Sequence, residues 1–241
     1  MKDIEGIILK EQPYSETSKL LKIITKEGII DLIAKGSRTL KSELRSVTTK
    51  MTYGVFHIHY KEDKLSTLIS VDVIDNLKNI KKDITKISYA SFLIELASQV
   101  IKQNNSEDIY NILVSALKKI NENYDPLVIT NIVELKYLDY LGVMPILDGC
   151  AICGIKSNIT TMAGSRGGYI CSNCYTNEKK VEEKSIKLLR MLYYVDIDKI
   201  SSTNIKENIK KEINDFIDEY YELYTGLYLK TKSFLKNLNK I

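Results

Sequence analysis

The sequence predicts an α+β protein with several domains, in which an N-terminal β-barrel precedes an α-helical bundle with an inserted metal-binding loop. Three observations support this prediction. Runs of β-branched residues come before Asp75, helical spacing of apolar residues follows it, and all four cysteines lie in one window between the helices. We therefore expect a barrel domain over residues 1–79 and a helical domain over residues 80–241, interrupted by a four-cysteine zinc finger over residues 147–178.

The first domain is expected to contain five short strands. Each is rich in β-branched or aromatic residues and is bounded by turn residues; the predicted strands are 4–10, 18–25, 29–34, 52–60 and 65–73. Gln12-Pro13 interrupts the first run, and Lys26-Glu27-Gly28 supplies a hairpin turn before the third. With the longest connection after the third strand, this count fits a five-stranded OB-fold barrel. An SH3-like barrel fits it too, and the pattern does not separate the two.

The rest of the chain is expected to be helical outside the cysteine window. Apolar residues recur there at intervals of three and four; the predicted helices are 83–103, 107–121, 126–140, 184–194 and 205–238. Asp125-Pro126 marks a helix start, because the carboxylate caps free amides and proline suits the first helical position. We expect that helix to stop at Gly142.

Composition narrows the class of protein. The chain has 241 residues, 44% of them hydrophobic, which is enough for one large or two small domains with buried cores. It contains no run of about 18 uncharged apolar residues, which excludes a membrane span, and the acidic start Met1-Lys2-Asp3-Ile4-Glu5 lacks the apolar core of a signal peptide. We therefore expect a cytoplasmic protein. The net charge of +4 permits a nucleic-acid partner without requiring one.

A basic loop follows the third predicted strand. The loop contains five cations and one acidic residue, Glu43; the cations are Lys35, Arg38, Lys41, Arg45 and Lys50. Gly36 lies between the first two, and a glycine at that position lets a backbone approach closely while both charges face one polyanion. The alternative is a polar loop that only keeps the sheet soluble. Charge and glycine alone do not decide between these two interpretations.

The four cysteines form two Cys-x-x-Cys pairs, Cys150 with Cys153 and Cys171 with Cys174. Two such pairs at this separation predict one structural Zn²⁺ per chain. Four thiolates leave no open position for water, so the metal would hold structure and perform no chemistry. Two disulfides are the main alternative, and a cytoplasmic chain argues against them. A redox dithiol needs only one pair, in a βαβ context that the sequence lacks.

Catalytic motifs are scarce, and we predict that the protein is not an enzyme. His57 and His59 are two residues apart on one predicted strand and share a face, but the sequence places no acidic cluster beside them to complete a metal site. The sequence contains no Walker loop, dinucleotide fingerprint or nucleophile elbow.

The N-terminal residues carry a family resemblance. The segments Gly6-Ile-Ile-Leu-Lys10, Glu16-x-Ser18-Lys-Leu-Leu-Lys-Ile-Ile-Thr25 and Ala34-Lys-Gly-Ser-Arg38 resemble those of the RecO family of bacterial recombination mediators. The order of small barrel, helical bundle, four-cysteine insertion and closing helices agrees with that family over essentially the whole chain. Some members of the family lack the cysteines, so the zinc prediction follows from the spacing and not from the resemblance.

The resemblance implies a function in DNA repair and recombination. It implies an OB-fold domain that binds single- and double-stranded DNA, anneals complementary strands and acts with RecR to replace single-stranded-DNA-binding protein by RecA. It also implies that the helical domain docks the acidic, apolar-ended C-terminal tail of the single-stranded-DNA-binding protein, and that the protein works on the nucleoid.

The resemblance also names candidate DNA contacts. Lys35 and Arg38 match the basic residues of the family's motif and take the DNA-binding role from it, while Lys41, Arg45 and Lys50 are added on charge alone. Four aromatic residues are candidates for stacking on bases, and at least half of them are expected in the barrel core; they are Tyr14, Tyr53, Phe56 and Tyr60.

Two other classes of function stay open. One is a zinc-ribbon scaffold that binds only protein, with the basic loop as a solvated face. The other is a nuclease-like enzyme that uses His57 and His59 with an unidentified carboxylate.

Overall fold

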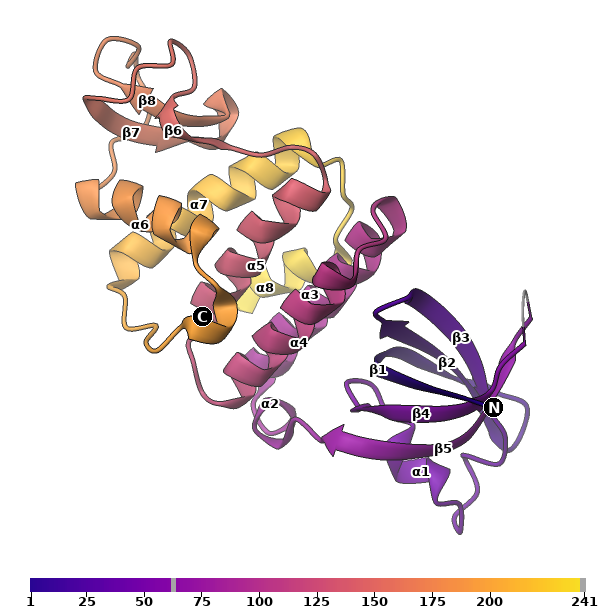
Figure 1. Ribbon diagram of the computed structural model, residues 1–241. Helices are drawn as coiled ribbons and strands as arrows, with labels where there is room; N and C mark the ends of the chain where they lie inside the picture. The colour runs from indigo at the N-terminus through magenta and orange to yellow at the C-terminus, as the bar shows by residue number, and fades with distance from the viewer. Residues whose placement is uncertain (62–63, 239–241) are drawn as a thin grey trace.

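The N-terminal part of the chain forms a closed five-stranded barrel (Figure 1). In the computed structural model, which describes residues 1–61 and 64–238, the strands are β1 (Lys2–Tyr14), β2 (Ser18–Thr25), β3 (Gly28–Ala34), β4 (Tyr53–His59) and β5 (Ser66–Asp75). Their order around the barrel is β1-β2-β3-β5-β4, and β4 pairs with β1 to close it. β3 and β5 pair in parallel, and the other neighbours are antiparallel. This order is that of an OB-fold, so the predicted barrel is confirmed and the SH3-like alternative is excluded.

β1 is longer than the sequence predicted, because it continues through Pro13. Its pairing with β4 ends at Ile7, whereas its pairing with β2 continues to Tyr14. Pro13 therefore lies where β1 has a neighbour on one side, a position that tolerates a missing amide. The prediction that Gln12-Pro13 interrupts this strand was wrong for that reason.

Alternate residues of the five strands fill the barrel interior. Its core is apolar throughout and consists of Ile4, Ile8, Leu21, Ile23, Leu32, Ala34, Phe56, Ile58 and Leu68. The period-two alternation of the sequence places these side chains on one face of the closed sheet.

The helices form a bundle around α3 (Figure 1). The bundle consists of α2 (Lys78–Lys81), α3 (Ile84–Gln103), α4 (Glu107–Asn121), α5 (Pro126–Tyr140), α6 (Glu183–Tyr194), α7 (Glu207–Tyr224) and α8 (Lys230–Leu238). The Asp83 carboxylate accepts hydrogen bonds from the first amides of α3, and Asp125 does the same for α5, with Pro126 at its first position. The helix starts read from these residues are confirmed.

The last predicted helix is broken into α7 and α8. Gly226, which follows α7, adopts φ of +62°, a left-handed conformation that ends a helix readily. The new start is then capped from elsewhere in the fold, because the Glu95 carboxylate of α3 accepts hydrogen bonds from the amides of Lys230 and Thr231. The prediction of one continuous helix over 205–238 was wrong: Gly226 is a local stop signal that the prediction passed over, whereas the cap of α8 depends on tertiary structure.

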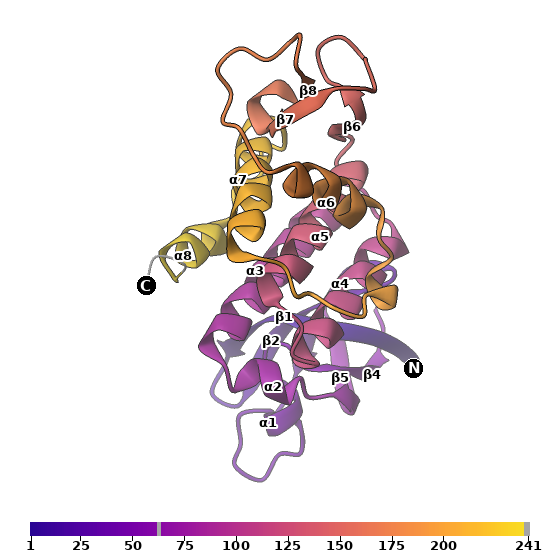
Figure 2. The ribbon, with the colours of Figure 1, turned by 90° about the vertical axis from the view of Figure 1, so that its left-hand side faces the viewer.

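The cysteine segment forms a small three-stranded sheet at the end of the molecule opposite the barrel (Figure 2). It consists of β6 (Ile146–Cys150), β7 (Ile159–Ala163) and β8 (Gly168–Cys171) in the order β6-β8-β7, with a 3₁₀ turn η1 (Gly164–Arg166) that packs on α7. Met162 and Tyr169 of this sheet join the core of the helical bundle.

The barrel and the bundle share one continuous core. Barrel residues such as Ile7, Ile24 and Met51 belong to the same buried cluster as the residues of α3 and α4. At this contact the Glu5 carboxylate accepts hydrogen bonds from the hydroxyls of Tyr53 and Tyr110, at 2.7 and 3.1 Å. Burial and the Glu5 charge raise the pKa of Tyr110, so that hydroxyl stays a donor. The barrel is therefore held against the bundle, while the domain boundary at residues 79/80 and the limits 147 and 178 of the insertion stay predictions.

Among the residues that the structure describes, no helix combines the length and the apolarity needed to cross a membrane.

Candidate nucleic-acid interface and candidate metal centre

The basic loop lies between β3 and β4, and it encloses the short helix α1 (Leu44–Val47). In Figures 1 and 2 this connection is on the side of the barrel that faces away from the cysteine sheet. All five predicted cations are exposed residues; they are Lys35, Arg38, Lys41, Arg45 and Lys50. The structure thus presents the charges of Lys35, Arg38, Lys41 and Arg45 to solvent.

Consecutive turns give the start of the loop a defined conformation. Gly36 adopts φ of +68°, which favours glycine, and a Cβ at this residue would meet no atom within 4 Å. The Ser37 hydroxyl donates to the carbonyl oxygen of Ala34 at 2.8 Å, and the Thr39 amide and hydroxyl both donate to that of Gly36. Glycine therefore suits this turn, and the space beside the Gly36 Cα stays open to a ligand.

Arg38 joins the loop to the turn between β1 and β2. Its amide donates to the carbonyl oxygen of Thr17 at 2.8 Å, and its guanidinium Nη1 donates to that of Ser15 at 2.7 Å. A guanidinium has five N–H donors, so the remaining ones stay available for a phosphate. Arg38 therefore has a structural role that its charge alone did not reveal.

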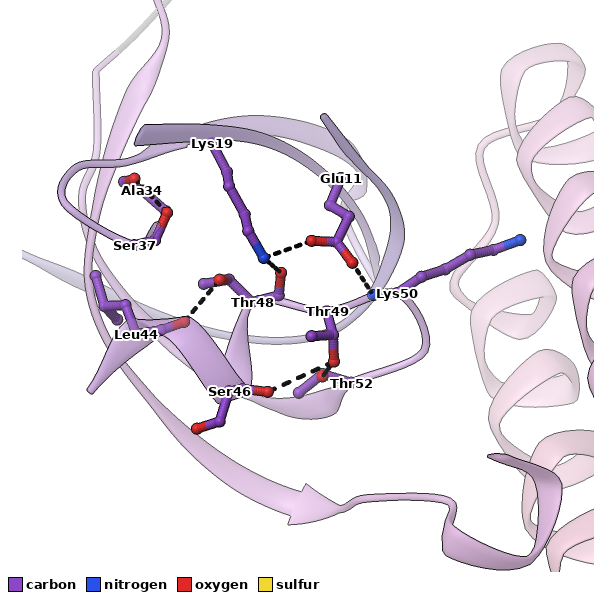
Figure 3. Close-up of polar contacts among 10 residues, drawn as sticks. All are labelled: Glu11, Lys19, Ala34, Ser37, Leu44, Ser46, Thr48, Thr49, Lys50 and Thr52. Carbon is purple, nitrogen blue, oxygen red and sulfur yellow. Dashed lines mark hydrogen bonds and ion pairs between the residues drawn. The ribbon is translucent and has the colours of Figure 1, made fainter. Parts of the chain in front are cut away.

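Glu11 anchors the far end of the loop (Figure 3). One carboxylate oxygen accepts from the Lys19 ammonium at 2.5 Å, and the other accepts from the Lys50 amide at 3.1 Å. The same ammonium also donates to the carbonyl oxygen of Thr48 at 2.9 Å. Both Glu11 and Lys19 are partly buried, so this pair is shielded from solvent and holds the loop against β1 and β2.

Lys50 differs from the other cations of the loop. Figure 3 shows its side chain extending away from the loop toward the helices, and its ammonium donates to the Ser91 hydroxyl of α3 at 3.2 Å. Burial against the bundle lowers the pKa of Lys50, and the nearby Glu95 charge opposes that shift. Lys50 therefore connects the barrel to the bundle, and its assignment as a DNA contact stays a prediction with the least geometric support.

The remaining cations are free for a ligand. Among the described residues, the side chains of Lys35, Lys41 and Arg45 have no hydrogen bond or ion pair with the protein.

Of the aromatic candidates, Tyr53 and Phe56 are buried in the structure, whereas Tyr14 and Tyr60 are about half exposed. Half of these rings are buried, but only Phe56 lies in the barrel core, because Tyr53 is buried where the barrel meets the bundle.

The two histidines do not form a metal site. His57 lies between two carboxylates, with Nδ1 at 2.7 Å from Asp3 and Nε2 at 3.0 Å from Asp72, and these bonds raise its pKa. His59 is exposed. Within residues 1–61 and 64–238, the only group of three or more close metal-binding side chains is the cysteine cluster, so the histidine pair gives the nuclease alternative no geometric support.

The four cysteines converge on one point. The sulfur atoms of Cys150, Cys153, Cys171 and Cys174 all lie within 4.8 Å of one another, and those of Cys153 and Cys171 are 3.6 Å apart. Tetrahedral zinc with bonds of about 2.3 Å separates its sulfurs by about 3.8 Å, so the geometry fits a metal ion. Cys150 and Cys171 are buried, while Cys153 is exposed.

Backbone amides shape both cysteine pairs and favour the thiolate form of Cys150. In the first pair, the Gly154 amide donates to the Cys150 carbonyl oxygen at 2.8 Å, and in the second the Cys174 amide donates to that of Cys171 at 3.1 Å, so each pair sits on a tight turn. Burial raises the pKa of Cys150, but backbone amides including that of Cys171 outweigh it and lower the value to about 6. A donor set of four thiolates would hold a metal with no open position.

The structure also contains a groove that sequence reasoning missed. It lies between α5, α6, the 3₁₀ turn η2 (Ile197–Lys199) and the start of α7, and has a volume of about 660 Å³. Apolar side chains such as Ile132, Leu188 and Met191 line it, and four exposed lysines lie along it: Lys184, Lys187, Lys199 and Lys206. The lysines lie on three separate segments of the sequence, so no single local pattern could have revealed the groove.

The fold and the two candidate sites place the chain in the class of proteins that join an OB-fold barrel to a helical body with a cluster of four cysteines compatible with a metal site. Residues 1–77 match the family described as Recombination protein O N terminal, and residues 81–233 match Recombination protein O C terminal.

Full-length relatives agree with these matches. The chain is 34% identical over 245 residues to DNA repair protein RecO of Listeria monocytogenes serotype 4b (strain CLIP80459), an alignment that covers 100% of this chain and 96% of the relative. It is 33% identical over 242 residues to DNA repair protein RecO of Bacillus cereus (strain AH187), covering 98% and 97%. The chain belongs to the RecO family of DNA repair proteins, as the resemblance in its sequence indicated.

Proposed function

We propose that the protein is a recombination mediator that binds single- and double-stranded DNA through the barrel and anneals complementary strands. With RecR it would replace single-stranded-DNA-binding protein by RecA on DNA in the cytoplasm, at the nucleoid. The observation that carries the proposal is the basic loop, which holds Lys35, Lys41 and Arg45 free in solvent on an anchored backbone. The metal in the cysteine site would be zinc, with a structural role.

Annealing by this mechanism requires no bond-making residue. Cations that neutralise phosphates on two strands reduce the repulsion between them, so that the bases can meet and pair. Contacts made by lysine and arginine to phosphates weaken with salt, and each phosphate neutralised adds roughly 0.7 to the log–log salt slope for single strands. Such contacts release the product more readily than a deep apolar site would.

A triple variant tests the loop. Replacing Lys35, Lys41 and Arg45 together by alanine removes three cations without breaking a hydrogen bond in the described structure. We expect the affinity for a single-stranded oligonucleotide to fall at least about tenfold and the salt slope to fall by about 2, while thermal stability stays the same. Fluorescence anisotropy across a salt series measures both quantities.

The matched control removes the same charge elsewhere. Lys82, Lys102 and Lys211 are exposed lysines of the helical domain, and replacing them together by alanine should change the salt slope little. Equal effects of the two triple variants would remove the loop from the proposal. Absence of any DNA binding by the unaltered protein would favour the alternative, a zinc-ribbon scaffold that binds only protein.

The groove between α5 and α7 is the proposed docking site for the tail of single-stranded-DNA-binding protein. An acidic peptide that ends in apolar residues would place its end against Ile132 and Met191 and its carboxylates near Lys184 and Lys206. This assignment is supported by the charge and the apolar lining of the groove.

Two variants test the groove. Met191→Glu should weaken binding of a labelled tail peptide at least about tenfold, because it puts a charge of the same sign as the peptide into the apolar lining. Met144→Glu is the control, since Met144 is an equally exposed methionine that does not line the groove. Annealing of oligonucleotides coated with the tail-bearing protein should fail for the first variant and proceed for the second.

A further inference from the structure

Tyr14 is an exposed aromatic residue at the rim of the barrel beside the basic loop. It is the last residue of β1 and pairs with Ser18, the first residue of β2. Lys19, the residue after Ser18, pairs with Ala34, the last residue of β3, and Lys35 of the basic loop follows Ala34 directly. Tyr14 and the cations of the loop therefore share one rim of the barrel.

The ring of Tyr14 is available to a ligand. It is 49% exposed, and within the described part of the chain it makes no hydrogen bond, ring contact or cation–π contact. A large apolar ring left free in this way at a cation-lined rim can stack on a base, since every base offers a flat face.

Arg38 fixes the turn that carries Tyr14. The next residue, Ser15, adopts φ of +56°, a left-handed conformation that is uncommon for serine. The Arg38 guanidinium donates to the carbonyl oxygen of Ser15, and its amide donates to that of Thr17. The loop thus holds the turn in a conformation that is strained for its sequence, and with it the backbone of Tyr14.

Tyr60 provides an internal comparison. It is similarly exposed, at 51%, but it follows the end of β4 that pairs with the start of β1, whereas Tyr14 ends that strand. Its ring is also engaged, because the Lys2 ammonium lies 5.3 Å from the ring centroid. The two tyrosines are therefore equally exposed, but they lie at different places on the barrel, and of the two only the Tyr60 ring has a cation against it.

We propose that Tyr14 stacks on an unpaired base of single-stranded DNA, with Arg38 as the residue that positions it. The proposal rests on the proposed function, because it assumes that DNA lies along the basic loop. Phosphates would lie against Lys35 and the free N–H groups of Arg38 while a base turns inward onto the ring. A base held in this way is kept out of its own stack and exposed for pairing.

The protein contains no tryptophan, so a single substitution supplies a local reporter. Tyr14→Trp places an indole at the proposed stacking position, and Tyr60→Trp places one at the comparison position. Each variant is titrated to saturation with an oligothymidine and with an abasic oligonucleotide of the same length and charge. We expect strong fluorescence quenching only for Tyr14→Trp with oligothymidine. Equal quenching of the two variants, or an unquenched Tyr14→Trp that still binds oligothymidine, would overturn the proposal.

Affinity measurements separate stacking from fold. Tyr14→Leu should lower the affinity for oligothymidine about fivefold or more without changing the affinity for the abasic strand or the salt slope, whereas Tyr14→Phe keeps the ring and should bind like the unaltered protein. Equal affinities of the leucine and phenylalanine variants would contradict stacking. Failure of the unaltered protein to bind either oligonucleotide would overturn the proposed function itself, and this inference with it.

A third variant tests the role of Arg38. Arg38→Lys keeps the charge but loses the planar donor group that reaches Ser15. Combined with Tyr14→Trp, it should reduce the quenching by oligothymidine while leaving the salt slope unchanged. Full quenching in this double variant would show that Arg38 does not position the ring.

Discussion

The cysteine sheet and the basic loop lie at opposite ends of the molecule and use their polar side chains in opposite ways (Figures 1 and 2). In the sheet, the same four side chains that would hold a metal would also hold the fold, because a metal bound at their common point would tie them together. In the loop, the backbone is held by Glu11 and Lys19, while Lys35 and Lys41 stay free. Ligand binding and stability would therefore coincide at the candidate metal centre and be largely separate at the barrel.

The largest expected effect tests the metal centre. Cys171→Ser removes one buried sulfur ligand of the proposed zinc site, so we expect the protein to lose its capacity to bind zinc and the free energy of unfolding to fall by about 3 kcal/mol or more. Metal analysis and urea denaturation measure the two losses. The affinity for DNA, measured where the variant is folded, should change less than about twofold, because the loop lies at the other end of the molecule.

The control for this variant is its neighbour. Ser172→Ala changes an exposed side chain next to the same ligand and should keep both zinc and stability. A Cys171→Ser protein that retains one zinc per chain and unfolds like the parent would show that the metal is not needed for the fold. A parallel loss of DNA affinity in the folded variant would instead break the separation between the two ends.

A smaller effect is expected where the loop is anchored. Glu11→Gln keeps the shape of the side chain but leaves the partly buried Lys19 ammonium without its counter-charge. We expect the free energy of unfolding to fall by about 1–2 kcal/mol and DNA affinity to fall severalfold, because the loop loses its hold on the Lys50 amide. Denaturation and anisotropy titrations measure the two changes.

Glu16→Gln is the matched control, because it removes the same charge from an exposed residue of the adjacent turn. Any gain in affinity from losing a negative charge near DNA should be common to both variants. The difference between them then measures the anchor. If the Glu11→Gln protein is less stable but binds DNA as the Glu16→Gln protein does, the shape of the loop does not matter for binding. Stability and DNA binding would then be fully separate in the barrel.

Local patterns in the sequence predicted most of the fold and both candidate sites. The bounds of β2 and α4 match the prediction residue for residue, since alternation and helical spacing are set by neighbouring residues. The cysteine cluster followed from spacing alone. The stop at Gly226 was missed although a glycine is a local signal, but the start of α8 could not be predicted, because the Glu95 carboxylate that caps it is far away in the sequence.

The same limit explains what the sequence did not reveal about the sites. Charge identified the five cations of the loop, but the contact of Lys50 with Ser91 and that of Arg38 with Ser15 depend on segments that only the fold brings together. The acidic partners of His57 were missed for the same reason, since Asp3 and Asp72 are adjacent only through strand pairing.

The smallest expected effect comes from His57, which belongs to neither candidate site. A change there tests whether protonation of the barrel can alter stability without involving the basic loop or the cysteine cluster. The bonds of His57 to Asp3 and Asp72 favour the protonated ring and raise its pKa. The stabilisation is therefore complete below the ordinary histidine pKa of about 6.5 and is lost as the pH rises through the higher pKa of the folded state. His57→Gln should flatten this part of the dependence of unfolding free energy on pH, measured by urea denaturation from about pH 5 to about pH 9. His59→Gln is the control, because it changes the exposed second histidine of the same strand, which has no hydrogen bond to a carboxylate among the described residues. A larger effect of His59→Gln than of His57→Gln would show that the aspartates do not hold the His57 proton.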